Sequence, residues 1–213
     1  VSTGSGRMAI HPECKVDGPV MDEACSYACD HCHVFVIDIG KCKSDSWQVL
    51  GLRNLVKRYP EMKFVACHLL APSDKDKDKL RQALEVLQFP NLWFDLSSLV
   101  HNCRPDTYPY LKAIEFIRLA KEIVGSEKLM FGTDMPSALK EDVYEHYVGY
   151  IDESPVFTEQ EKEQIFYENA YAVYFANKYC RRRETKMRKN VRKLDALLMA
   201  GAMAVTTARC MPT

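Results

Sequence analysis

Apolar residues along the chain gather in short continuous runs, and segments with helical spacing separate these runs. Continuous apolar runs of this length are typical of strands that are buried on both faces. Five such runs occur, at residues 7–10, 34–37, 63–67, 92–94 and 128–131. Between them, apolar residues recur every three or four positions and predict helices at residues 20–30, 48–59, 80–87 and 110–124. The chain is therefore expected to alternate strands with helices.

This alternation predicts an α/β fold with a parallel sheet, which either closes into a barrel or stays open and doubly wound. The periodicity fits both arrangements equally well. Polar residues follow four successive strands, at Asp38, His68, Asp95 and Asp134. Because active sites of barrel enzymes collect side chains from the carboxyl ends of several strands, this pattern favours a TIM-like (β/α)8 barrel.

A capping box predicts the start of a closing helix at Thr158. In Thr158-x-x-Glu161 each side chain can satisfy the other residue's backbone N–H. Helical spacing then predicts an inward face on this helix, made of Ile165, Phe166, Ala172, Val173 and Phe175.

Composition excludes some classes of protein. Lysine plus arginine equals aspartate plus glutamate at 29 each, so the whole chain offers no basic footprint for nucleic acid or an anionic membrane. No apolar run approaches the roughly 18 residues of a membrane span. Nine cysteines without a regular framework indicate free thiols, and hence a cytoplasmic location.

The charge is unevenly distributed along the chain. Residues 178–193 hold nine basic residues and one acid, a net charge of +8, which leaves −8 on the rest. We therefore divide the chain into a domain at residues 1–179 and an unassigned basic tail at 180–213. The tail is interpreted as a solvated or disordered segment, as an arm that binds an acidic partner, or as appended unrelated sequence.

Four stretches together resemble a known family. They are residues 55–68, 90–97, 125–136 (with Phe131-Gly132-Thr133-Asp134-Met135-Pro136) and 168–174. In order and spacing they resemble the amidohydrolase-related, metal-dependent hydrolases, a group that includes aromatic-acid decarboxylases and lactone hydrolases. The resemblance implies that the strands here are the fourth to eighth of an incomplete barrel. The family's first-strand His-x-His metal ligands have no counterpart before Arg7, so a fragment that is inactive in isolation is expected.

The resemblance also implies roles for three residues. Asp134 matches the last-strand aspartate, which binds or faces the metal and takes the proton of the attacking water. His68 matches a histidine near that water, as a ligand or acid–base partner. Asp38 stands where the family usually has a histidine ligand, so either a divalent metal such as zinc or manganese is still held or the metal has been lost. His11 could also face the site, and Asp95 and Ser97 are interpreted as capping or substrate-side residues.

Two other patterns suggest different chemistry. Cys25, Cys29 and Cys32 have the spacing of an iron–sulfur radical enzyme, but they end a predicted helix and precede a strand, at the wrong rim of a barrel. His31 and His33 imitate a His-x-His pair at that same rim, where a zinc site with the cysteines would lack the usual knuckle spacing.

The leading hypothesis is a metal-dependent hydrolase, or a related decarboxylase, that acts on a small carboxylated or cyclic substrate. The alternative is a non-catalytic barrel fragment or remnant with a binding role. The expected partner is a small-molecule substrate, with no nucleic acid and no membrane. Homo-oligomers are also expected, because an incomplete barrel exposes unpaired strand edges.

Overall fold

The structure, a computed structural model, describes residues 15–42, 47–73 and 75–176. The chain divides into two units, Val1–Ala176 and Asn177–Thr213, and the whole of the second lies outside the described residues, as does the predicted strand at residues 7–10. The predicted basic tail and His11 therefore remain untested. Within the described residues, no helix is long and apolar enough to cross a membrane.

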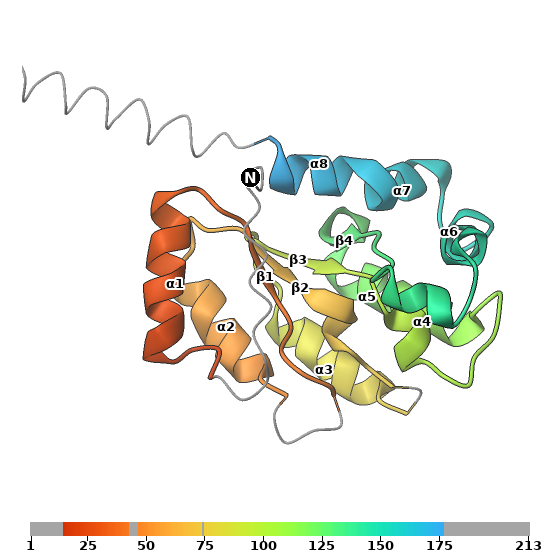
Figure 1. Cartoon of the computed structure of the whole chain (residues 1–213), viewed down its shortest axis with the longest axis horizontal. Coiled ribbons are helices and arrows are strands. Elements are labelled where there is room, and N and C mark those ends of the chain that lie inside the picture. Colours follow the sequence, from red (N-terminus) through yellow and green to blue (C-terminus); the bar gives the residue numbers. More distant parts are fainter. Residues whose placement is uncertain (1–14, 43–46, 74, 177–213) are drawn as a thin grey trace, which may run out of the picture. The chain divides into compact units, whose positions relative to one another are not determined.

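Four strands form a parallel sheet in the order β1-β2-β3-β4 (Figure 1). They are β1 (Phe35–Ile37), β2 (Phe64–Ala66), β3 (Leu92–Asp95) and β4 (Leu129–Met130). Each coincides with a predicted run, shortened by one or two residues at its ends or, for β3, lengthened by Asp95. Phe35 pairs with Phe64 and Phe64 with Leu92, so the strands start at nearly the same level.

Helices precede, connect and follow the strands. They are α1 (Pro19–Asp30), α2 (Val49–Arg58), α3 (Lys77–Val86), α4 (Leu99–Asn102), α5 (Leu111–Val124), α6 (Tyr144–Asp152), α7 (Glu159–Glu163) and α8 (Asn169–Tyr174). Short 3-10 segments are η1 (Cys67–Leu70), η2 (Ser126–Lys128) and η3 (Ser137–Lys140), and η4 (Gln164–Glu168) is a π-helical turn. The sequence pattern predicted α1, α2, α3 and α5 but neither α4 nor α6.

The two faces of the sheet pack against different helices. Alternate strand residues, among them Phe35, Phe64 and Phe94, join the main core with the apolar faces of α2, α3 and α5. The intervening residues Val36, Val65 and Met130 pack with Val173 of α8. Sequential strand order with the connecting helices on one face is the winding of a barrel, since an open doubly wound sheet carries connecting helices on both faces.

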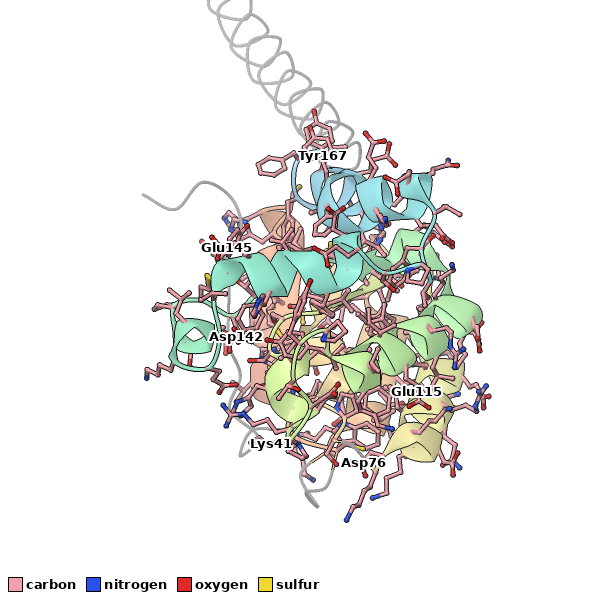
Figure 2. The ribbon with its side chains drawn as sticks, turned by 90° about the vertical axis from the view of Figure 1, so that its right-hand side faces the viewer. Lys41, Asp76, Glu115, Asp142, Glu145 and Tyr167 are labelled. Carbon is pink, nitrogen blue, oxygen red and sulfur yellow. The ribbon has the colours of Figure 1, made fainter. Side chains whose placement is uncertain are left out.

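An ion-pair cluster joins the outer helices α3 and α5. Glu115 of α5, labelled in Figure 2, accepts from Lys77 Nζ at 2.6 Å and from Lys112 Nζ at 2.9 Å. These bonds lower the pKa of Glu115 to about 2, with Lys112 the larger contribution. The cluster lies on the outer layer of the fold.

The closing helix begins as predicted but turns differently. Both bonds of the Thr158–Glu161 capping box are present. The predicted inward face is correct for Ile165 and Val173, which are fully buried, and wrong for Ala172 and Phe175, which are exposed. The cause is the π-helical turn η4, which inserts an extra residue and so rotates the downstream face.

Candidate functional site

Three predicted site residues follow three different strands. Asp38 comes directly after β1, His68 two residues after β2, and Asp134 four residues after β4. His68 Nε2 lies 4.0 Å from Asp38 Oδ2, and the two side chains are 16% and 40% exposed. Asp134 is bound by a residue of the loop that follows β3: Ser98 Oγ donates a hydrogen bond to Asp134 Oδ2 at 2.7 Å. The parallel sheet thus gathers all three at the C-terminal ends of its strands, which we call its C-terminal edge.

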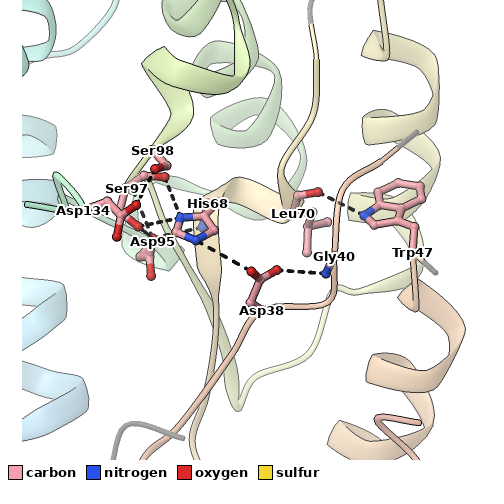
Figure 3. Close-up of polar contacts among 9 residues, drawn as sticks. All are labelled: Asp38, Gly40, Trp47, His68, Leu70, Asp95, Ser97, Ser98 and Asp134. Carbon is pink, nitrogen blue, oxygen red and sulfur yellow. Dashed lines mark hydrogen bonds and ion pairs between the residues drawn. The ribbon is translucent and has the colours of Figure 1, made fainter. Parts of the chain in front are cut away.

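Asp95 and Ser97 link the loops that follow β2 and β3. Asp95 Oδ1 accepts from the backbone N–H groups of His68 and Ser97, each at 3.0 Å, and from the Ser97 hydroxyl. His68 Nδ1 lies 2.9 Å from Ser97 Oγ and 3.0 Å from the Ser97 carbonyl oxygen. Figure 3 shows His68 between Asp38 on one side and Asp95, Ser97, Ser98 and Asp134 on the other. Asp95 does not cap helix α4, whose N-cap is Ser98; its carboxylate instead holds the loops after β2 and β3 together.

The backbone of these loops is strained. His68, Ser98 and Asp134 have φ values of 61°, 54° and 64°, in the left-handed region that non-glycine residues rarely adopt. The run from His68 to Ala71 is left-handed throughout, and Trp47 Nε1 donates to Leu70 O at 3.0 Å within it. Strain of about 1–3 kcal/mol per residue persists only where the surrounding contacts enforce it, and it concentrates at functional sites.

A glycine lets two of these loops approach closely. A Cβ atom at Gly132 would lie only 3.0 Å from Ser97 Cβ, closer than such atoms normally come. Any larger residue would push the Asp134 loop away from the Ser97–Ser98 loop. Sequence reasoning missed Ser98 and Trp47, whose partners lie 36 and 23 residues away in the chain.

The donor atoms of the site suit a divalent metal in type but not in number. Carboxylate oxygen and imidazole nitrogen both bind zinc and manganese. Asp38 Oδ1 already accepts from Gly40 N at 2.9 Å, which leaves Oδ2 facing His68. Across the described ranges, no group of three or more His, Cys, Asp or Glu side chains could hold a metal ion. The described residues therefore do not by themselves make a metal centre.

The cysteine pattern does not form a cluster either. Cys25 is fully buried in the core, and burial, with a smaller contribution from the charge of Asp22, raises the pKa of its thiol to about 12. Cys32 is disulfide-bonded, so the expectation that every cysteine is a free thiol is wrong at this position. His31 stacks on Tyr27 at the end of α1, before β1 and hence at the opposite edge of the sheet from His68.

Comparison with known proteins identifies the family. The sequence profile of the amidohydrolase family matches residues 10–176, most of the chain. The chain belongs to the amidohydrolase family. No curated protein matches the sequence of this amidohydrolase significantly.

Several solved structures share the fold. A zinc-bound amidohydrolase from Burkholderia multivorans is 18% identical with a TM-score of 0.68, over 80% of this chain and 64% of that one. A putative 2-pyrone-4,6-dicarboxylic acid hydrolase from Pseudomonas putida is 14% identical with a TM-score of 0.56, over 80% and 62%. A manganese-bound 5-carboxyvanillate decarboxylase from Novosphingobium aromaticivorans is 14% identical with a TM-score of 0.52, over 79% and 55%.

These structures extend beyond the matched region. The chain spans less than two thirds of the length of each relative, between 55% and 64%. At these identities the likeness shows the fold of the amidohydrolases. How many strands of a barrel this chain contributes, and whether Asp38, His68 and Asp134 act in catalysis, remain predictions.

Proposed function

We propose that the chain forms part of an amidohydrolase that hydrolyses a small carboxylated or cyclic substrate, or that carries out the related decarboxylation. The observation that supports this most is the meeting of His68, Asp38 and Asp134 at the C-terminal edge of a parallel sheet. They come from three loops, two of which contain strained, non-glycine residues. Such convergence at this edge is where enzymes of barrel type place their reacting groups.

A divalent ion, zinc or manganese, is part of this proposal. When bound, such an ion lowers the pKa of a water molecule to about 7 and so supplies a nucleophile at neutral pH. Both metals occur in structures of related proteins, zinc in the B. multivorans amidohydrolase and manganese in the decarboxylase. Because the described residues hold too few donors, the proposal requires further ligands from outside them.

The described residues have their own tasks in this proposal. Asp134 is half-buried, and its Oδ2 is held by the Ser98 hydroxyl, so Oδ1 is the oxygen that accepts a proton from the attacking water. His68 presents Nε2 towards Asp38, where an imidazole can pass a proton to or from the substrate. Asp38 places a carboxylate on the side of the site that His68 Nε2 faces.

The test combines turnover with metal analysis. The full chain would be incubated with zinc or manganese and a panel of carboxylated lactones and aromatic acids, following ring opening and CO2 release. Metal content would be measured in the chain, in Asp134→Ala and in the matched control Asp152→Asn, whose carboxylate is exposed at the end of α6. Turnover with stoichiometric metal, both lost only in Asp134→Ala, is the expected result.

A second candidate is a non-catalytic barrel remnant with a binding role. The observation in its favour is the lack of a three-donor group among the described residues. It predicts that the folded chain retains neither zinc nor manganese and turns over no substrate of the panel. We also propose homo-oligomer formation, because β1 pairs with only one strand among the described residues; light scattering that shows a monomer would contradict it.

A further inference from the structure

The hydrogen bonds around His68 determine where its imidazole carries a proton. His68 Nδ1 lies 3.0 Å from the Ser97 carbonyl oxygen, which can only accept a hydrogen bond. Nδ1 must therefore carry a hydrogen. In a neutral imidazole the lone pair then resides on Nε2.

The Ser97 hydroxyl supports the same assignment. Its proton is directed to the Asp95 carboxylate, which has no proton of its own to donate, so Ser97 Oγ offers a lone pair to Nδ1 at 2.9 Å. This order also excludes a different reaction. Ser97 cannot act as a nucleophile with His68 as its base, because the ring nitrogen beside it already holds a hydrogen.

Asp95 holds both ends of this arrangement. Its Oδ1 binds the N–H of His68, whose backbone is strained at φ 61°, and also orients Ser97. The geometry points to Asp95 and Ser97 as positioning residues that hold the hydrogen of His68 on Nδ1, so that the neutral ring is the Nδ1–H tautomer and Nε2, 4.0 Å from Asp38 Oδ2, is its proton-accepting nitrogen. As an aid to catalysis this rests on the proposed function, but the tautomer is a property of the chain alone.

The test is the tautomer of His68 measured by long-range ¹H–¹⁵N spectroscopy of the full chain, without metal or substrate. The spectrum would be recorded at a pH where the ring is neutral, with the His68 signals assigned from a His68→Gln variant. We expect a protonated, pyrrole-type Nδ1 and an unprotonated, pyridine-type Nε2. Ser97→Ala keeps the carbonyl acceptor but removes the hydroxyl acceptor and its link to Asp95, so the Nε2–H form, which free imidazole side chains favour, should gain population.

A neighbouring serine supplies the matched control. Ser98 belongs to the same loop but donates to Asp134 rather than contacting His68, so Ser98→Ala should leave the tautomer unchanged. Asp95→Asn, which keeps an acceptor oxygen but loses the charge that orients Ser97, should shift the tautomer in the direction of Ser97→Ala. Amide spectra that overlay away from the site would show that each variant is folded.

Two results would overturn the inference: an Nε2–H tautomer in the unaltered chain, or equal effects of Ser97→Ala and Ser98→Ala. Failure of the proposed function looks different. If the chain shows the Nδ1–H tautomer but no turnover and no metal, the positioning of His68 stands and the enzymatic role falls. In an active protein, the loss of such an orienting contact should lower activity about 10- to 100-fold.

Discussion

The two ends of the sheet use polar side chains in opposite ways. At the N-terminal edge, the residues directly before β2, β3 and β4 are Lys63, Asn91 and Lys128. Each of them donates to backbone carbonyls. Lys63 Nζ binds Ala172 O at 2.6 Å, Lys128 Nζ binds Pro90 O at 2.7 Å, and Asn91 Nδ2 lies within 3.3 Å of three carbonyl oxygens.

At the C-terminal edge, polar side chains bind backbone N–H groups and also one another. The Ser97 side chain joins His68 to Asp95, and the Ser98 side chain joins the same loop to Asp134. Asp38 Oδ2 and His68 Nε2 face each other at 4.0 Å, beyond direct hydrogen-bonding distance. One edge uses its polar groups to fasten the backbone, whereas the other keeps polar atoms available for chemistry. Mutations at the first should reduce stability, and mutations at the second should reduce activity.

The largest expected effect is on activity, at Asp134. Asparagine tolerates the left-handed backbone found there but cannot accept a proton as a carboxylate does. Asp134→Asn should lower kcat about 10²- to 10⁴-fold, the usual contribution of a general base, with the free energy of unfolding changed by less than about 1 kcal/mol. Steady-state kinetics and urea unfolding would measure the two. A stability loss as large as that of an Asn91 variant would remove the distinction between the edges.

The next effect is on stability, at Asn91. Its side-chain amide is buried and bridges the carbonyl oxygens of Val56, Tyr59 and Met62. Asn91→Ala leaves these acceptors without their donor and should lower the free energy of unfolding by about 2–4 kcal/mol. Urea denaturation would measure this loss. At temperatures where the variant is folded its turnover should be normal, so a selective loss of kcat would contradict the comparison.

The sequence predicted the strands, the helices and the positions of the site residues better than it predicted the hydrogen bonds that hold the two edges. Strands and connecting helices followed from local periodicity, and the positions of Asp38, His68 and Asp134 from polar residues after apolar runs. The roles of these three residues came from the family resemblance and stay predictions. The bonds of Asn91 and Ser98 span 29 to 36 residues and depend on how the loops pack, so no local pattern contains them. The π-helical turn η4 was not predicted for a related reason, because the helical pattern assumes the same number of residues in every turn.

A smaller effect tests the strain of the C-terminal edge. Ala71 ends the left-handed run, with φ 50° and ψ 53°. Glycine adopts this conformation freely, and this gain offsets the loss of a buried methyl group, so Ala71→Gly should change the free energy of unfolding by less than about 1 kcal/mol. The matched control is Ala120→Gly in helix α5, which should destabilise by about 1–2 kcal/mol through helix propensity and a lost buried methyl group. Equal destabilisation of both variants in urea would show that the loop is unstrained.

The smallest expected effect on stability is at the ion-pair cluster of the outer helices. It gives the change in unfolding free energy with which mutations at the two edges can be compared. The pKa of Glu115 is lowered from its usual 4.5 to about 2 by Lys112 and then Lys77. A depressed carboxyl pKa stabilises the fold above the unfolded value, and the contribution is lost as pH falls from about 4.5 to about 2. Because all three side chains are partly exposed, at 27%, 37% and 45%, the cluster should contribute no more than about 1 kcal/mol. Glu115→Gln should therefore be slightly less stable than the unaltered chain at pH 7 and equal to it near pH 2, with the difference reduced by salt. A difference that persists at pH 2 would mean that packing, rather than charge, couples α3 to α5.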